Sequence, residues 1–159
     1  MWSVFGGKSA LCRFQWRNET RVETEFKYVL EGELRILVVD DDPIMREFAS
    51  VFLATPTVTI ETADCGEAAL ARLEGEHFDL AMVDLDMPGI DGYEVLRRVR
   101  AHPRLRDMPV VIVTSNEDMG SIDRAYQLGA TSFTTKPVNW RLLSYHLRFV
   151  LRAQRALAA

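Results

Sequence analysis

Residues 83–92 read VDLDMPGIDG, in which an apolar segment leads directly into acidic residues and a Pro-Gly loop. The chain carries an apolar run, FDLAMV at 78–83, straight into Asp84, with a second acid at Asp86. A short apolar run bounded by a Pro-Gly loop is typical of a buried strand. An ionised carboxylate that leaves water without a partner costs several kcal/mol or binds a proton instead. Asp84, at the end of such a strand, therefore needs a partner.

From residue 34 onward, short apolar runs alternate with segments of helical period. Continuously apolar strands joined by helices favour a parallel sheet that is covered on both faces. Such sheets carry their functional sites at the carboxyl ends of the strands. The sequence thus predicts an α/β fold with a doubly wound, five-stranded parallel sheet, whose strands are LRILVV (34–39), TVTIET (57–62), FDLAMV (78–83), PVVIVT (109–114) and TSFTT (131–135).

Two of the connecting helices have clear starting signals. The first begins at Pro43, a residue favoured at the first helical position. In the second, Asp64 and Glu67 form a start that resembles a capping box. The first helix also places four apolar side chains on one face, those of Ile44, Phe48, Val51 and Phe52.

The composition excludes several kinds of partner. The 159 residues are 48% apolar with a net charge of -4, which leaves no basic footprint for nucleic acid or an anionic membrane surface. The sequence contains neither an apolar run of about 18 residues nor a secretory leader, so no membrane span is expected. Cys12 and Cys65 are too few for a disulfide framework, and the three histidines lack metal-ligand spacing. These features predict a cytoplasmic protein.

Polar residues gather where the predicted strands end. Three aspartates at 40–42 follow the first strand, Asp84 ends the third, Thr114 ends the fourth, and Lys136 follows the fifth. Carboxylates that are crowded at one rim repel one another, so they take up protons, point into the solvent or bind a cation. Oxygen ligands without histidine or thiolate favour a hard ion, and Mg²⁺ is the usual choice where room is left for water and a phosphate. A metal ion, a hydroxyl and an ammonium would stabilise a phosphoryl group transferred to Asp84.

Four motifs, ILVVDDDP, VDLDMPGIDG, VIVTS and TTKP, occur in this order at compatible spacing. Together they resemble the receiver domain of bacterial two-component response regulators. The resemblance implies a flavodoxin-like fold and a phosphoryl group that is taken from a sensor histidine kinase or a phosphotransfer protein. It also implies a change of shape that signals to an output partner. A receiver is not an enzyme in the usual sense, because it catalyses only its own phosphorylation and dephosphorylation.

The same resemblance implies a role for individual residues. Asp84 matches the phosphorylated aspartate, while Asp40 and Asp41 match the acidic pair that binds Mg²⁺, with Asp41 as the direct ligand. Asp86 matches the position whose backbone carbonyl completes the metal site. The remaining matches are the phosphoryl-binding hydroxyl of Thr114, the pairing ammonium of Lys136, the aromatic switch residue Phe133, and Pro137, which usually follows a cis peptide bond.

Several of these acids and aromatics have structural explanations as well. Asp42 and Asp91 are better explained as helix-capping or loop acids than as metal ligands. Solvation explains the Asp86 side chain equally well, since the family uses only its backbone for the metal. Phe133 fits a core aromatic as well as a switch, and without a polar tip it would act through packing alone.

Two other functions stay open at this point. Asp84 and Asp86 reproduce the Asp-x-Asp spacing of aspartyl-phosphate hydrolases of the haloacid dehalogenase type. That family, however, carries the motif on its first strand and has Thr or Val where Pro88 stands. The other alternative is a receiver-like interaction module that is not phosphorylated, against which the intact Thr114 and Lys136 argue.

The two ends of the chain are expected to add to a plain receiver. Residues 1–33 form an N-terminal extension of unassigned role, for which we prefer a short strand followed by a helix over 20–32. Residues 34–155 form the receiver domain, and 156–159 are the tail of the last helix. That helix should contact a second copy of the chain or a separate output protein. The apolar surface of this helix is wider than one packed face needs. It consists of Leu142, Phe149 and Ala156 at heptad spacing, beside Leu143, Val150 and Leu157.

Overall fold

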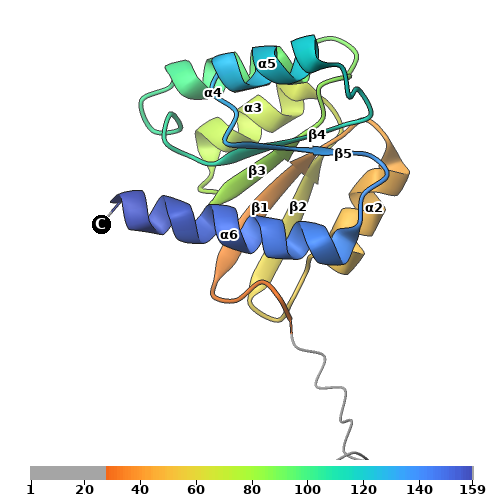
Figure 1. Ribbon diagram of the computed structural model, residues 1–159. Helices are drawn as coiled ribbons and strands as arrows, with labels where there is room; N and C mark the ends of the chain where they lie inside the picture. The colour runs from red at the N-terminus through yellow and green to blue at the C-terminus, as the bar shows by residue number, and fades with distance from the viewer. Residues whose placement is uncertain (1–27, 159) are drawn as a thin grey trace, which may run out of the picture.

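The computed structural model describes residues 28–158, which form a five-stranded parallel sheet in the order β2-β1-β3-β4-β5 (Figure 1). The strands are β1 (Leu34–Val39), β2 (Val58–Ala63), β3 (Leu80–Val83), β4 (Val110–Thr114) and β5 (Ser132–Thr135). The helices are α2 (Pro43–Phe52), α3 (Gly66–Gly75), α4 (Gly92–Ala101), α5 (Met119–Gln127) and α6 (Trp140–Ala158). The predicted doubly wound α/β fold is confirmed.

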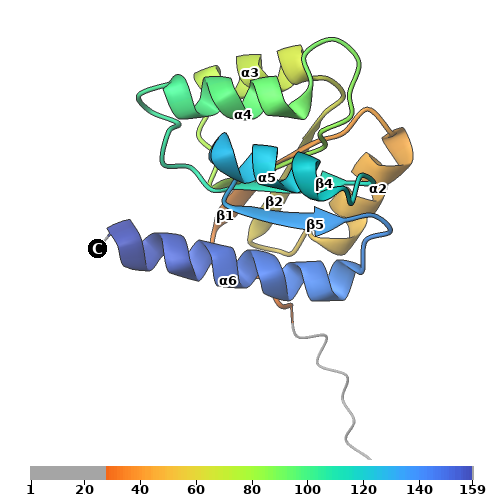
Figure 2. The same cartoon turned by 45° about the horizontal axis from the view of Figure 1, so that its top comes forward.

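Helices cover both faces of the sheet. α3, α4 and α5 lie on one face, and α2 and α6 lie on the other (Figure 1 and Figure 2). Successive residues of β1 alternate between these layers, so that Leu37 packs with the first group of helices and Ile36 with the second. β3 and β4 are buried along their whole lengths. A charged residue directly after β3 therefore lies at the rim of a two-sided core.

Acidic residues begin three of the helices. Asp42, Asp91 and Asp118 are the N-caps of α2, α4 and α5, and each carboxylate accepts a hydrogen bond from a backbone amide of the first turn. Such a cap satisfies an amide that has no partner inside the helix. Asp42 and Asp91 are thus capping residues, as predicted.

The predicted capping box of α3 is wrong by one residue. The N-cap is Cys65 in place of Asp64, and the Cys65 Sγ accepts a hydrogen bond from the Ala68 amide at 3.4 Å. Glu67 also bonds outside its own helix, since its Oε1 accepts from the Ile90 amide at 3.2 Å. Glu67 therefore connects α3 to the loop that follows β3.

The apolar face of α2 points outward. Ile44, Phe48, Val51 and Phe52 do share a face, but their exposed fractions are 61%, 46%, 62% and 55%. The sheet side of this helix is occupied by the smaller Ala49. The Phe52 ring stacks on Trp140 of α6 at a centroid distance of 5.8 Å. Periodicity correctly grouped these side chains, and tertiary packing placed them on the surface.

The chain reaches β1 through an irregular segment, residues 28–33. Leu30 is buried in the core on the α2 and α6 side of the sheet, and a Glu31 oxygen lies 3.7 Å from the Arg148 guanidinium. Gly32 has a φ of +91°, a left-handed conformation that suits glycine. The helix predicted over 20–32 is therefore wrong for residues 28–32. The remainder of the predicted extension, including its short strand, lies outside the described residues.

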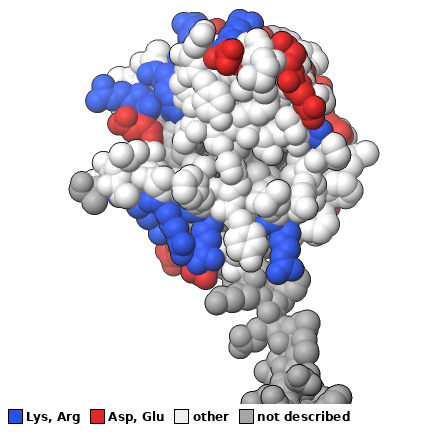
Figure 3. Space-filling view, in the orientation of Figure 1, with Lys and Arg blue, Asp and Glu red and all other residues white. Residues whose placement is uncertain are grey.

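α6 runs without a break to Ala158 and projects past the sheet at its carboxyl end (Figure 1). Leu143, Leu147 and Val150 face the core, whereas Leu142 and Phe149 are 67% and 70% exposed. Figure 3 shows a mostly uncharged surface where α6 crosses this face, with Lys and Arg side chains gathered below it. None of the helices between residues 28 and 158 is both long and apolar enough to cross a membrane.

Candidate functional site

Four adjacent strands deliver the predicted site residues to one rim of the sheet. Asp40 follows β1, Asp84 follows β3, Thr114 is the last residue of β4, and Lys136 follows β5. Because these strands are parallel neighbours, their carboxyl ends meet at the same edge. Backbone hydrogen bonds hold the rim together: the Asp84 amide donates to the Val39 carbonyl at 2.9 Å, and the Lys136 amide donates to the Thr114 carbonyl at 2.9 Å.

Lys136 joins the two buried acids of this rim. Its ammonium donates to Asp40 Oδ2 at 2.7 Å and to Asp84 Oδ2 at 3.0 Å. The side chains of Asp40 and Asp84 are only 4% and 6% exposed, and that of Lys136 is 19% exposed. Backbone amides bond the other oxygens, from Asp42 to Asp40 Oδ1 at 2.9 Å and from Asp86 to Asp84 Oδ1 at 3.1 Å. Both buried carboxylates are thus hydrogen-bonded on each oxygen.

Burial and pairing shift the pKa values of Asp84 and Lys136. Burial raises the pKa of Asp84 by more than the hydrogen bonds from Lys136 and the Asp86 amide lower it. Burial lowers the pKa of Lys136, but its hydrogen bonds to Asp40 and Asp84 outweigh this and leave that pKa above its ordinary value. Lys136 is therefore charged, while the charge on Asp84 is less favourable than in water. A further cation beside Asp84 would favour its ionised form.

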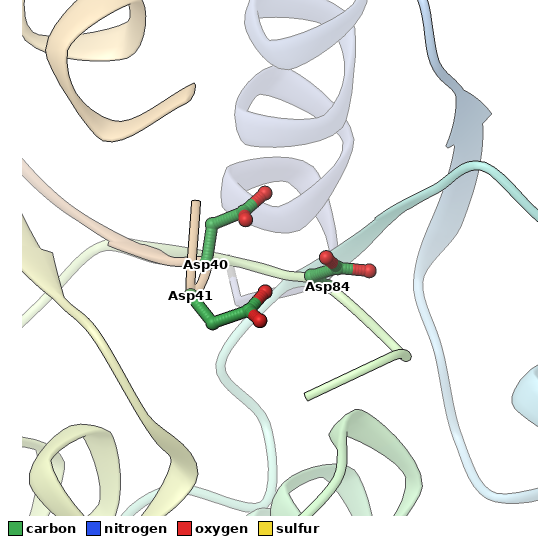
Figure 4. Close-up of side chains that lie close together, drawn as sticks. All are labelled: Asp40, Asp41 and Asp84. Carbon is green, nitrogen blue, oxygen red and sulfur yellow. The ribbon is translucent and has the colours of Figure 1, made fainter. Parts of the chain in front are cut away.

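Three carboxylates at this rim can share one ion. Asp40, Asp41 and Asp84 each offer an oxygen, and these oxygens lie within 4.8 Å of one another (Figure 4). Asp41 is exposed, and the other two are buried. Within residues 28–158, Lys136 is the only cation that bonds these carboxylates, so negative charge is in excess. A hard, all-oxygen donor set with excess negative charge fits Mg²⁺, which Asp40, Asp41 and Asp84 would hold.

Asp86 contributes a side-chain contact that the sequence did not indicate. Its Oδ2 accepts a hydrogen bond from the Thr114 hydroxyl at 3.3 Å. Thr114 is fully buried, Asp86 is exposed, and the Thr114 oxygen also accepts from the Asn116 amide at 3.2 Å. No sequence pattern signals this contact, because the two side chains lie 28 residues apart and meet only through the folded loops.

Close backbone contacts hold the loop that follows Asp84. A Cβ at Gly92 would lie 2.3 Å from the Asp84 carbonyl oxygen, so glycine is required where α4 starts against the strand end. On the other side, Gly89 has a φ of +75° and lies against the Glu67 carboxylate. Hydrogen bonds from the amides of Glu67 itself and of Ile90 hold the pKa of Glu67 below its usual value. Sequence reasoning missed this attachment of the loop to α3.

Phe133 lies on β5, away from the charged cluster. Its backbone is in register with Ile112 of β4, and its ring is half-buried against the core on the side of α3, α4 and α5. This position is compatible with a core aromatic and with a switch that acts through packing. The Lys136–Pro137 peptide bond is cis, as the resemblance implies.

Comparisons with known proteins agree with this geometry. A profile described as the response regulator receiver domain matches residues 36–148. The heme response regulator HssR of Staphylococcus aureus is 34% identical over 119 residues, which cover 75% of this chain and 52% of HssR. The chemotaxis response regulator CheY4 of Vibrio cholerae is 28% identical with a TM-score of 0.71, over 75% of this chain and 99% of that one. A CheY-like receiver domain protein from Methanospirillum hungatei is 30% identical with a TM-score of 0.73, over 79% and 98%.

This chain belongs to the response regulator receiver domain family. It spans about half the length of the curated relatives that it matches. The matched residues contain all four strand ends that build the site. Receiver domains are generally not classical enzymes. Family membership therefore favours the receiver interpretation over the haloacid dehalogenase alternative. The position of Asp84 after the third strand, not the first, supports the same choice.

Proposed function

We propose that Asp84 accepts a phosphoryl group from a histidine kinase or a phosphotransfer protein in a Mg²⁺-dependent reaction. The observation that carries this proposal is the buried Asp84 carboxylate, which Lys136 bonds at 3.0 Å and which has oxygens of Asp40 and Asp41 within 4.8 Å. A nucleophilic carboxylate, an ammonium and further acids for a metal ion are the groups that phosphoryl transfer to a carboxylate requires.

In the proposed step, an Asp84 oxygen attacks the phosphorus of a phosphohistidine. The P–N bond breaks, and the leaving imidazole keeps the electron pair and takes up a proton. Lys136 remains next to Asp84 and pairs with the negative charge of the transferred group. Mg²⁺, when bound, would supply charge neutralisation at the phosphoryl oxygens. Water later hydrolyses the acyl phosphate, which returns Asp84 and releases phosphate.

The response is proposed to run from Thr114 and Phe133 to the surface of β5 and α6. Thr114 ends β4, and its hydroxyl is bonded to the Asn116 amide, so a movement of this hydroxyl acts directly on the next loop. At the far end, the exposed Leu142 and Phe149 of α6 would contact a second copy of the chain or a separate output protein. We propose no direct contact with nucleic acid or membrane, and a cytoplasmic location stays a prediction.

Phosphate uptake is tested by incubating the protein with acetyl phosphate and Mg²⁺ and measuring its intact mass. The receiver gains one labile phosphoryl group, a hydrolase consumes the donor over many turnovers, and an interaction module does neither. Asp84→Asn removes the nucleophile and keeps the shape of the side chain, so this variant should gain nothing. Full labelling of Asp84→Asn would refute the assignment.

The α6 contact is tested by light scattering on a variant that keeps the core intact. Leu142→Glu with Phe149→Glu changes only exposed positions, so the fold should survive. We expect the molar mass of the wild type, with beryllofluoride as a phosphoryl mimic, to exceed that of the variant. The α6 proposal would be contradicted if the wild type stays monomeric with and without beryllofluoride and no partner protein binds it through α6.

A further inference from the structure

A continuous chain of hydrogen bonds leads from Asp84 to the loop after β4. The Asp86 amide donates to Asp84 Oδ1 at 3.1 Å, and the Asp86 Oδ2 accepts from the Thr114 hydroxyl at 3.3 Å. The Thr114 oxygen accepts from the Asn116 amide at 3.2 Å. Asp86 thus bonds Asp84 through its backbone amide and the Thr114 hydroxyl through its side chain.

The Thr114 hydroxyl can donate one hydrogen bond, and in this structure the Asp86 carboxylate accepts it. Thr114 is fully buried, so water cannot readily replace a lost acceptor. The Asn116 amide already uses one acceptor position of the same oxygen. If an anionic group on Asp84 accepts a hydrogen bond from this hydroxyl, the hydrogen bond from Thr114 to Asp86 must therefore break.

We propose that the Asp86 carboxylate is a latch: it holds the Thr114 hydroxyl in the resting chain and competes for its proton with a phosphoryl group on Asp84. The inference rests on the proposed function, because the competing group is the phosphoryl group. Asp86 then acts as a positioning residue through its side chain, in addition to any use of its backbone at the metal site. It sets how readily Thr114 responds.

Two features suit Asp86 to this role. Its carboxylate oxygen accepts from the Thr114 hydroxyl, but the bond is long at 3.3 Å and the residue is exposed, so the hydrogen bond is weak enough to be broken. Its backbone amide bonds Asp84 directly, so a change in what Asp84 carries changes the bonding of Asp86 at the same time. A single residue thus senses Asp84 and releases Thr114.

The test is a double-mutant cycle in the full chain with beryllofluoride and Mg²⁺ as the probe. Bound beryllofluoride is measured by ¹⁹F NMR in the wild type, Asp86→Ala, Thr114→Ala and the double variant. Removing the latch should tighten beryllofluoride binding by roughly threefold to tenfold more when Thr114 is present than when it is alanine. Any effect of the Asp86 charge alone appears equally in both backgrounds, so the difference reports the latch.

Asp42→Asn supplies a matched control. Asp42 is another exposed acid of this rim that caps α2, and asparagine keeps the cap while removing the charge. Its effect should be the same with and without Thr114, within about twofold. Equal effects of Asp86→Ala in the two backgrounds would overturn the latch and leave Asp84 as the acceptor. Failure of the wild type to bind beryllofluoride would overturn the proposed function, and the latch with it.

Discussion

Two clusters of charged side chains lie on the same sheet and differ in their charge balance. The edge cluster, beside β2, consists of Arg35, Arg72, Glu61 and Glu76. Glu61 bonds both arginines, and Glu76 also bonds both. The two guanidinium groups lie over the Phe78 ring, with Arg35 at 4.7 Å and Arg72 at 5.7 Å from its centroid. Two positive charges here meet two negative charges.

The rim cluster, at the carboxyl ends of β1, β3 and β5, is unbalanced. Lys136 bonds Asp40 and Asp84, and Asp41 offers a third carboxylate within 4.8 Å of both. One positive charge therefore meets three negative charges, two of them on buried groups. Burial of unpaired negative charge costs stability, which a bound cation restores. Under the proposed function, charge imbalance, more than the number of ion pairs, distinguishes the site that binds a ligand from the cluster that only stabilises the fold.

The largest expected difference between the clusters concerns Mg²⁺. Asp41→Ala removes an exposed carboxylate from the rim, so it should lower Mg²⁺ affinity and the rate of labelling by about tenfold or more, since each carboxylate supplies charge and an oxygen ligand. Glu61→Gln, in the edge cluster, should leave both quantities unchanged. Isothermal titration with Mg²⁺ and intact-mass labelling measure the two effects. An unaltered titration for Asp41→Ala would remove that residue from the metal site.

A second prediction separates phosphate uptake from the response to it. Thr114→Ala should still be labelled at Asp84, because the nucleophile and Lys136 remain in place. It should lose most of the amide chemical-shift changes in the loop around Asn116, because the hydroxyl that bonds this amide is gone. Two-dimensional NMR of the phosphorylated protein compares the two. Identical shifts in variant and wild type would exclude Thr114 from the response.

A pH dependence should distinguish Asp84 from ordinary aspartates. Burial raises the pKa of Asp84, so without metal the folded chain binds a proton there more tightly than the unfolded chain does. The stability of the metal-free wild type therefore falls as pH rises from the ordinary pKa of aspartate to the raised one. Asp84→Asn cannot ionise, and at pH 7 its Tm should be higher than that of the wild type by roughly 2–5 °C.

Thermal denaturation by circular dichroism across this pH range checks the prediction. The difference in Tm should shrink at acidic pH, where Asp84 is protonated in the folded wild type. A variant that is less stable than the wild type at pH 7, or a difference that does not change with pH, would contradict the account of the buried charge.

The rim was predictable from the sequence because its residues stand at the carboxyl ends of strands in a parallel sheet. Asp40, Asp84, Thr114 and Lys136 each stand at or just after the end of an apolar run, and in a parallel sheet such ends share one edge. The meeting of Asp40, Asp84 and Lys136 at this edge could be predicted without knowing their side-chain conformations. Acidic N-caps such as Asp42 were also predictable, because they stand directly before a helix start in the sequence.

What the sequence did not indicate depends on packing between distant segments. Periodicity placed Phe48 and Phe52 on one face of α2, but only the folded chain brings Trp140 next to them on the surface. The contact between Asp86 and Thr114 likewise requires two loops to meet. Side-chain hydrogen bonds between loops carry no sequence period, so pattern reasoning assigned the Asp86 side chain no partner.

The smallest expected effect belongs to the edge cluster. Glu61→Gln weakens the ion pairs with Arg35 and Arg72, both of which are partly exposed to water. Partly exposed pairs contribute little, so the free energy of unfolding should fall by about 1 kcal/mol or less. Urea denaturation measures this change. A much larger loss would indicate that this cluster contributes more to stability than its balanced, partly exposed charges suggest.

Thermal denaturation with and without Mg²⁺ for the wild type, Asp84→Asn and Glu61→Gln tests whether the unbalanced rim binds the cation. If the unbalanced rim binds the cation, Mg²⁺ at about ten times its dissociation constant should stabilise the wild type by about 1.4 kcal/mol and raise its Tm by roughly 3–6 °C. Glu61→Gln should show the same increase, and Asp84→Asn should show little or none. An equal increase in all three proteins, or none in the wild type, would contradict the account.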